Sequence, residues 1–161
     1  MDLAGRYRIA APRQKVWEGL NDPELLKQSI PGCEELTQES PTHFAAVVVA
    51  KLGPVKAKFS GAVDLENLEP PAGYTLRGEG KGGVAGFGKG EAQVRLDEEA
   101  PEVTILSYDA QAQIGGKLAQ IGSRLIKGSV KKLAGEFFTN FASALGAEAE
   151  ELPVEEGGGS A

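Results

Sequence analysis

The sequence predicts a single α+β domain, in which a curved antiparallel sheet of about seven strands wraps around one long C-terminal helix. Apolar and polar residues alternate over most of residues 34–114, a pattern typical of half-buried strands. The apolar period then lengthens to 3.6 residues between residues 117 and 146, which predicts a helix of about 30 residues. The length of 161 residues suits one domain.

The N-terminal part predicts a strand followed by two short helices. Residues 3–10 alternate in polarity and are expected to form a half-buried strand. Pro12 opens the first helix, where its missing N–H costs nothing, and Trp17 lies on the apolar face of that helix. Asp22 can cap the second helix, with Pro23 in its first position.

The most regular strand is residues 55–68, and it follows the two-residue turn Gly53-Pro54. Carrying the register of this hairpin back places residues 44–52 in a neighbouring strand and His43 on the outer face. Later strands are expected over residues 74–81, near residues 91–96, and over residues 102–114. This order of elements is the helix-grip arrangement, which commonly leaves a cavity between helix and sheet.

Glycine is concentrated in the sheet, with seven of the 22 glycines between residues 78 and 90. Gly78-x-Gly80-x-x-Gly83 has the spacing of a dinucleotide-binding loop, and residues 83–89 imitate a phosphate-binding loop. Both motifs require a helix directly after them, whereas a strand follows here. We expect a bent hairpin, with a movable hairpin that carries Phe87 as an apolar plug left open as an alternative.

Small residues recur on the inward face of the predicted sheet, so a single helix would leave space above them. That reasoning, with the resemblance given below, predicts a lipophilic pocket; ordinary core packing is the alternative for each side chain. The predicted ligand-binding residues are Trp17, Phe59, Tyr74, Phe87, Leu106, Tyr108, Ile121, Leu125, Phe137 and Phe138.

The net charge of −6 lies almost entirely in residues 147–161, which carry five glutamates and no base. We therefore divide the chain into a ligand-binding domain, residues 1–146, and an acidic flexible tail, residues 147–161. The nearly neutral domain argues against nucleic acid as a partner. One face of the long helix is basic; it is either an ordinary solvated face or a docking surface for an acidic partner or anionic lipid. Its bases are Lys117, Arg124, Lys127, Lys131 and Lys132.

The reactive residues are few, with one Cys and one His in the whole chain. A disulfide within the chain and a Cys/His zinc cluster are therefore excluded. A catalytic His43 would need a nucleophile and an enclosed site, and Cys33 has no neighbouring base in the sequence. We expect no catalytic residue, no metal site and no enzymatic activity. The sequence shows neither a signal peptide nor a membrane-spanning run, so we expect a cytoplasmic protein.

Several segments together resemble one family. They are Leu20-Asn21-Asp22-Pro23-Glu24-Leu25, Ile30-Pro31-Gly32-Cys33-Glu34, Gly53-Pro54-Val55-Lys56-Ala57, Gly78-Glu79-Gly80-Lys81-Gly82-Gly83 and Gly115-Gly116-Lys117-Leu118-Ala119-Gln120. With Ala11-Pro12 and Val16-Trp17, they are similar to the family of the carbon monoxide dehydrogenase G subunit (CoxG-like). That family lies within the START/Bet v 1-like (SRPBCC) superfamily, and the resemblance covers about residues 1–146.

The resemblance implies a non-catalytic accessory protein for a molybdenum hydroxylase such as aerobic CO dehydrogenase. It implies a lipophilic ligand, expected here to be a respiratory isoprenoid quinone, either menaquinone or ubiquinone. We expect its tail against Phe59, Tyr108, Leu125 and Phe137, and its headgroup near Trp17 or Phe87. Peripheral contact with the inner face of the cell membrane is also implied. The alternatives are an assembly, maturation or membrane-recruitment factor without a small ligand and, last, a small hydrolase or cyclase.

Overall fold

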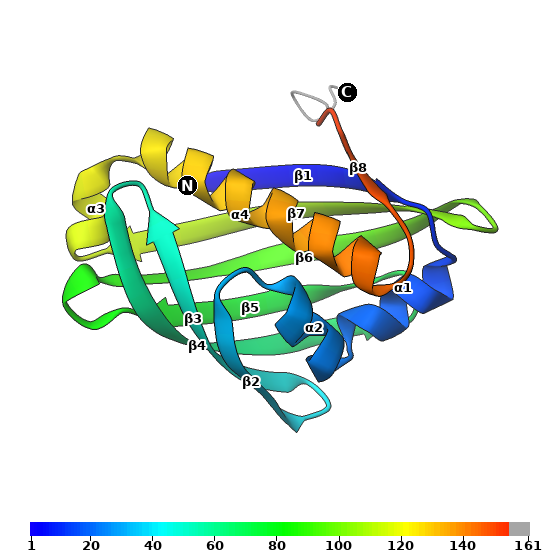
Figure 1. Ribbon diagram of the computed structural model, residues 1–161, viewed down its shortest axis with the longest axis horizontal. Coiled ribbons are helices and arrows are strands. Elements are labelled where there is room, and N and C mark those ends of the chain that lie inside the picture. Colours follow the sequence, from blue (N-terminus) through cyan, green and yellow to red (C-terminus); the bar gives the residue numbers. More distant parts are fainter. Residues whose placement is uncertain (155–161) are drawn as a thin grey trace.

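A computed structural model of the protein describes residues 1–154 and has the predicted α+β architecture (Figure 1). A strongly curved antiparallel sheet follows the order β2-β3-β4-β5-β6-β7-β1-β8, and the long helix α4 crosses its concave face. The elements are β1 (Asp2–Ile9), α1 (Arg13–Leu20), α2 (Pro23–Ser29), β2 (Cys33–Ser40), β3 (His43–Leu52), β4 (Val55–Glu69), β5 (Gly73–Lys81), the 3-10 turn η1 (Gly83–Ala85), β6 (Phe87–Ala100), β7 (Val103–Gly115), α3 (Lys117–Ile121), α4 (Ser123–Ala144) and β8 (Ala149–Leu152).

The register of the sheet confirms the predicted inner face. Leu52 pairs with Val55 across the Gly53-Pro54 turn, and Val63 pairs with Phe44 on one side and Gly78 on the other. Since side chains alternate along each strand, every inward residue therefore faces α4. His43 pairs with Asp64 and lies on the outer face, as predicted.

The buried core occupies one end of the interior, where α1, α2 and the C-terminal part of α4 lie against the sheet (Figure 1). Phe141 is completely buried, and Tyr7 stacks on Phe138 with ring centroids 4.3 Å apart. The Asp22 carboxylate accepts hydrogen bonds from the backbone N–H groups of Glu24 and Leu25 at the start of α2, which confirms the predicted cap. The short helices thus seal this end of the molecule.

The prediction of one unbroken helix over residues 117–146 is wrong. The helix is divided into α3 and α4 at Gly122, whose φ of +99° is incompatible with a continuous α-helix. The break changes which residues of α4 face inward. Ile126 is buried with 2% exposure, whereas Leu125 is 57% exposed.

The prediction of a flexible tail from residue 147 is wrong for residues 149–152, which form β8 as an eighth strand beside β1. The side of β1 that faces away from β7 has free backbone donors and acceptors, and the glutamates of the segment meet a base there. Arg8 binds Glu99 at 2.8 Å and Glu150 at 3.0 Å. The remaining predicted tail, residues 155–161, lies outside the described residues.

We predict that Gly128→Ala stabilises the protein. Gly128 lies in α4 without a positive φ, and a Cβ there would meet no heavy atom within 4 Å. The substitution should raise the free energy of unfolding by up to about 1 kcal/mol, and so raise Tm by about 2–4 °C. Gly122→Ala is the control, because its φ of +99° makes an alanine there destabilising. Calorimetry in which Gly128→Ala lowers Tm would contradict this description of α4.

Candidate functional site

The concave face of the sheet is filled at one end and accessible at the other. At the filled end, Leu96, Leu106 and Tyr7 stand side by side on adjacent strands and are almost fully buried. At the other end, every inward side chain is only half-buried, so water can reach between the sheet and α4. We call these residues the open half: Ala46, Val48, Ala50, Ala57, Phe59, Gly61, Gly78, Gly80, Gly88, Gly90, Ala112 and Ile114.

The open half is accessible because small residues coincide across the strands. Gly78 pairs with Gly90, which pairs in turn with Ala112, and a parallel row contains Gly61 and Gly80. A Cβ built at Gly80 would lie 3.9 Å from its nearest neighbour, the Ser60 carbonyl oxygen. The arrangement therefore leaves an apolar floor with room above it. Such a floor can bind an apolar molecule by excluding water.

Three connections close off the open half at what we call the tip: the β3–β4 turn, η1, and the α3–α4 segment. The Gly53 N–H donates a 2.8 Å hydrogen bond to Ser129 Oγ, which joins the turn to α4. A Cβ at Gly53 would lie only 3.0 Å from Ile121 Cγ2, so α3 also packs closely on this turn. The ring of Phe59 covers Gly82 and the ring of Phe87 covers Gly115.

Six of the ten predicted ligand-binding residues come together at the filled end. Tyr74 and Trp17 are in contact, with ring centroids 5.6 Å apart. Phe138 contacts Tyr108 and Phe137, with centroid separations of 6.3 Å and 4.9 Å. The six residues form or adjoin the buried core, and contact between them and a ligand stays a prediction: Trp17, Tyr74, Leu106, Tyr108, Phe137 and Phe138.

The other four predicted residues lie near the tip. Phe59 is half-buried on the inner face and Ile121 packs on the β3–β4 turn. Phe87 is 45% exposed, and Leu125 is mostly exposed because of the break at Gly122. Leu125 is also about 18 Å along the helix axis from Phe137, at 1.5 Å per residue. The predicted set therefore divides between the core and the tip.

The tyrosines near the helix remain protonated at neutral pH. Burial raises the pKa of Tyr7 to about 12, with the Glu151 carboxylate adding to the shift. Burial also raises the pKa of Tyr74 and of Tyr108. Their hydroxyls can therefore donate a hydrogen bond to a carbonyl oxygen.

Two residues that matter here were missed from the sequence. Ile126 is the buried side chain in the first turns of α4, and only an allowance for the break at Gly122 would have pointed to it. Ser129 joins α4 to Gly53 from 76 residues away, and no local pattern announces that contact.

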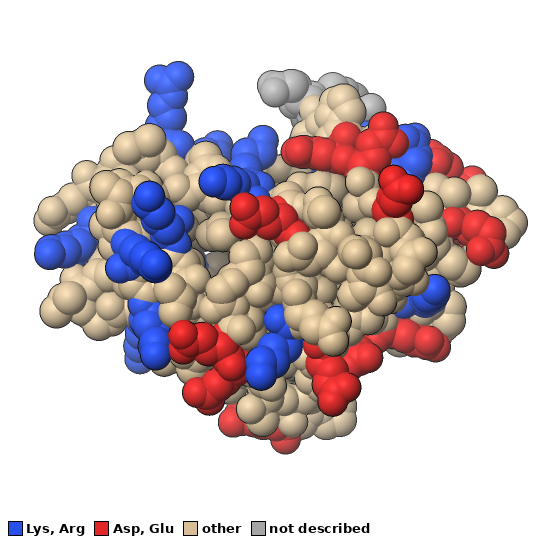
Figure 2. Space-filling model, in the orientation of Figure 1, with Lys and Arg blue, Asp and Glu red and all other residues tan. Residues whose placement is uncertain are grey.

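The five predicted docking bases are exposed on α3 and α4 (Figure 2). None of them has a carboxylate partner within 4.0 Å among residues 1–154: Lys117, Arg124, Lys127, Lys131 and Lys132. Two surface hollows border this helix. One of about 510 Å³ lies between α4 and β8 and includes Lys132 and Tyr7, and the other, of about 730 Å³, includes Lys127, Lys131 and Asp109.

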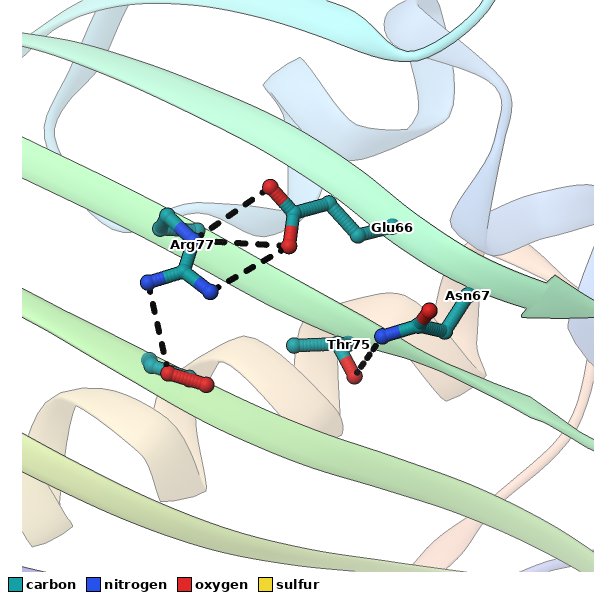
Figure 3. Close-up of polar contacts among 5 residues, drawn as sticks. Glu66, Asn67, Thr75 and Arg77 are labelled. Atoms are coloured by element: carbon teal, nitrogen blue, oxygen red, sulfur yellow. Dashed lines mark hydrogen bonds and ion pairs between the residues drawn. The ribbon is translucent and has the colours of Figure 1, made fainter.

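The outer face of the sheet holds ordinary ion pairs. Arg77 binds Glu66 at 3.3 Å and Glu91 at 3.4 Å, so Glu91 has a basic neighbour as expected, and Asn67 donates to Thr75 (Figure 3). In the described part of the chain, no group of three His, Cys, Asp or Glu side chains could hold a metal ion. No helix of residues 1–154 is long and apolar enough to cross a membrane.

We predict that Ser129→Ala loosens the tip, because the Gly53 N–H loses its acceptor. The free energy of unfolding should fall by about 1 kcal/mol, and amide hydrogen exchange should accelerate in residues 51–56. Ser143→Ala is the matched control, since Ser143 is an exposed serine of the same helix with no side-chain hydrogen bond in the described chain. Equal exchange in the two variants would show that the bond does not hold the turn.

We predict that His43 gives the protein a pH-dependent stability. The hydrogen bond to Asp64, at 2.7 Å, raises the pKa of His43 above 6.5, and Glu39 adds to the shift. The protonated form is favoured in the folded state, so this contribution is complete below pH 6.5 and is lost as pH rises through the folded pKa. Denaturant unfolding of the wild type and His43→Gln should converge towards high pH. A pKa at or below 6.5, measured by NMR on this single histidine, would contradict it.

Three comparisons with known proteins bear on the identity of the chain. A family model described as that of the carbon monoxide dehydrogenase G subunit (CoxG) matches residues 5–146. A search of curated protein sequences returned no match. Among solved structures, a conserved protein from Geobacillus kaustophilus is 29% identical, with a TM-score of 0.82, over 92% of this chain and 99% of that one.

More distant structures share the fold. A START superfamily protein from Mycobacterium smegmatis is 17% identical, with a TM-score of 0.62, over 89% of this chain and 93% of that one. The Zhui aromatase/cyclase from Streptomyces sp. R1128 is 15% identical, with a TM-score of 0.64, over 91% and 93%. The fold is therefore that of the START/Bet v 1-like proteins, and the chain belongs to the CoxG family of carbon monoxide dehydrogenase accessory proteins.

Proposed function

We propose that the protein is a non-catalytic carrier of an isoprenoid quinone, menaquinone or ubiquinone. In this proposal it couples a molybdenum hydroxylase, such as a CO dehydrogenase, to the membrane electron-transport chain. The observation that carries the proposal is the open half of the inner face, an apolar floor that α4 leaves accessible. Membership of the CoxG family supports the hydroxylase as partner.

The chemistry of the interior suits such a ligand. An isoprenoid tail is apolar and flexible, and it can fill the space above glycines and alanines that α4 does not reach. A quinone ring presents two carbonyl oxygens, and the protonated hydroxyls of Tyr7, Tyr74 and Tyr108 are the donors nearest the core. The bound tail is therefore expected in the open half, with the ring toward the aromatic residues.

The electron transfer in this proposal belongs to the ligand and the hydroxylase. The quinone accepts two electrons from the reduced hydroxylase and two protons from water, and it leaves as quinol. The carrier supplies an apolar interior, a route in and out, and a docking surface. Its own side chains take no part in the redox step.

A factor for assembly, maturation or membrane recruitment of the hydroxylase, without a small ligand, is the second candidate. The unpaired bases of α3 and α4 favour it, since they offer a docking surface that needs no interior ligand. This candidate predicts binding to the apo-hydroxylase. It also predicts that electron transfer is unaffected when quinone is withdrawn.

The test of the proposal is native mass spectrometry of the purified chain, followed by lipid extraction. We predict one quinone per chain in the wild type. Gly80→Leu should lose most of it, because the added side chain occupies the open half, while Tm should not fall because a Cβ at Gly80 has no close neighbour. Ser60→Leu, on the outer face of β4, is the matched control and should keep the quinone.

Two results would overturn the carrier proposal. One is a wild-type protein that holds no quinone and takes none from quinone-loaded vesicles. The other is a Gly80→Leu variant that holds as much quinone as the Ser60→Leu control, since the ligand would then lie elsewhere.

A further inference from the structure

The segments that form the tip and lead away from it carry charge of a single sign. Residues 45–63, 80–90 and 110–135 contain ten of the 17 Lys and Arg of the chain and none of its 23 Asp and Glu. These bases are Lys51, Lys56, Lys58, Lys81, Lys89, Lys117, Arg124, Lys127, Lys131 and Lys132. Figure 2 shows basic side chains gathered at this end of the visible face and acidic ones towards the opposite end.

The bases are largely free to meet another surface. Lys58 binds Glu34 at 3.1 Å, and the other nine have no carboxylate within 4.0 Å in the described part of the chain. A molecule with its positive charge at one end is oriented by a negatively charged surface before it makes contact.

Exposed apolar side chains stand among these bases. Of the five large apolar residues exposed in the described chain, three lie at the tip: Val84 in η1, Phe87 at the start of β6 and Leu125 in the first turn of α4. Their exposed fractions are 89%, 45% and 57%. Exposed apolar groups framed by polar residues mark interaction surfaces.

We infer that the tip docks on an anionic lipid bilayer. In that arrangement Val84, Phe87 and Leu125 enter the headgroup region, and the surrounding bases face the lipid phosphates. The combination of an apolar point with a broad basic surround is the pattern of peripheral membrane binding.

The composition of the tip favours lipid over a protein partner. Nine of its ten bases are lysine, and lysine is depleted in protein interfaces, where arginine is enriched. Lysine is a flexible point charge that suits a fluid array of phosphates, whereas arginine suits fixed bidentate contacts. An acidic protein as occupant is an outcome that the experiment below detects.

The position of the tip gives the docking a purpose that rests on the proposed function. The ring of Phe59 covers Gly82, beside η1, while its backbone belongs to the open half. Ile121 packs on the β3–β4 turn that ends the two strands of this floor. A docked tip would therefore bring the open half next to the bilayer from which a lipophilic ligand comes.

The experiment is co-sedimentation of the full chain with vesicles of phosphatidylcholine alone or of phosphatidylcholine mixed with phosphatidylglycerol. We expect binding only to the anionic vesicles, and less binding as salt shortens the Debye length from about 10 Å at 0.1 M to about 3 Å at 1 M. Reversing two tip charges, Arg124→Glu with Lys127→Glu, should weaken partition by about tenfold or more. Val84→Asp should also weaken it.

Matched controls lie at the other end of the sheet. Lys15→Glu with Arg95→Glu makes the same change in net charge, and Leu68→Asp places the same carboxylate on another exposed apolar residue. Both controls should bind anionic vesicles more strongly than the corresponding tip variants. A Val84→Trp reporter should show a blue-shifted emission that brominated lipid quenches, while Leu68→Trp should not.

The inference is overturned if the wild type does not bind anionic vesicles at low salt. It is also overturned if tip and control variants bind equally, or if the tip variants lose only the binding of an acidic protein. Quinone content, measured on the same preparations, separates this result from the carrier proposal. Vesicle binding without quinone removes the carrier and keeps the docking, whereas quinone with no tip-dependent vesicle binding does the reverse.

Discussion

The alternation of side chains along the curved sheet is the constraint on which the rest of the structure depends. Because the strands pair in one continuous antiparallel register, each inward residue joins a row that crosses several strands. Rows with Tyr7, Leu96 and Leu106 fill the space under α4, and rows with Gly78, Gly80 and Gly90 leave it open. One register thus produces both a stable core and an accessible floor. A shift of one residue in a strand would put polar side chains on that floor.

The features that could be predicted from the sequence depend on local patterns. The Gly53-Pro54 turn and the long alternation after it define the register of β3 and β4, and Asp22 with Pro23 marks the start of α2. Glycine-rich loops without a following helix were correctly interpreted as part of the sheet, since Phe87 begins β6 directly after η1.

The features that were missed depend on contacts distant in sequence. Gly122 has an ordinary place in the apolar period of the helix, and only the packing of α3 on Gly53 and η1 accompanies its left-handed φ. That break exchanges Leu125 for Ile126 on the inner side and moves one predicted ligand contact to the surface. A strand of four residues such as β8 has too little alternation to be recognised without the neighbouring strand that it pairs with.

The short strand β8 has a consequence for how copies of the protein behave toward one another. Without it, residues 6–9 of β1 would present unpaired backbone N–H and C=O groups at the side of a large sheet. A free sheet edge of this kind is a template for pairing with an edge of a second molecule. β8 occupies that edge and places Glu150 and Glu151 along it, so that an approaching strand meets carboxylates. The segment thereby protects the sheet against self-association while the opposite end of the molecule stays open.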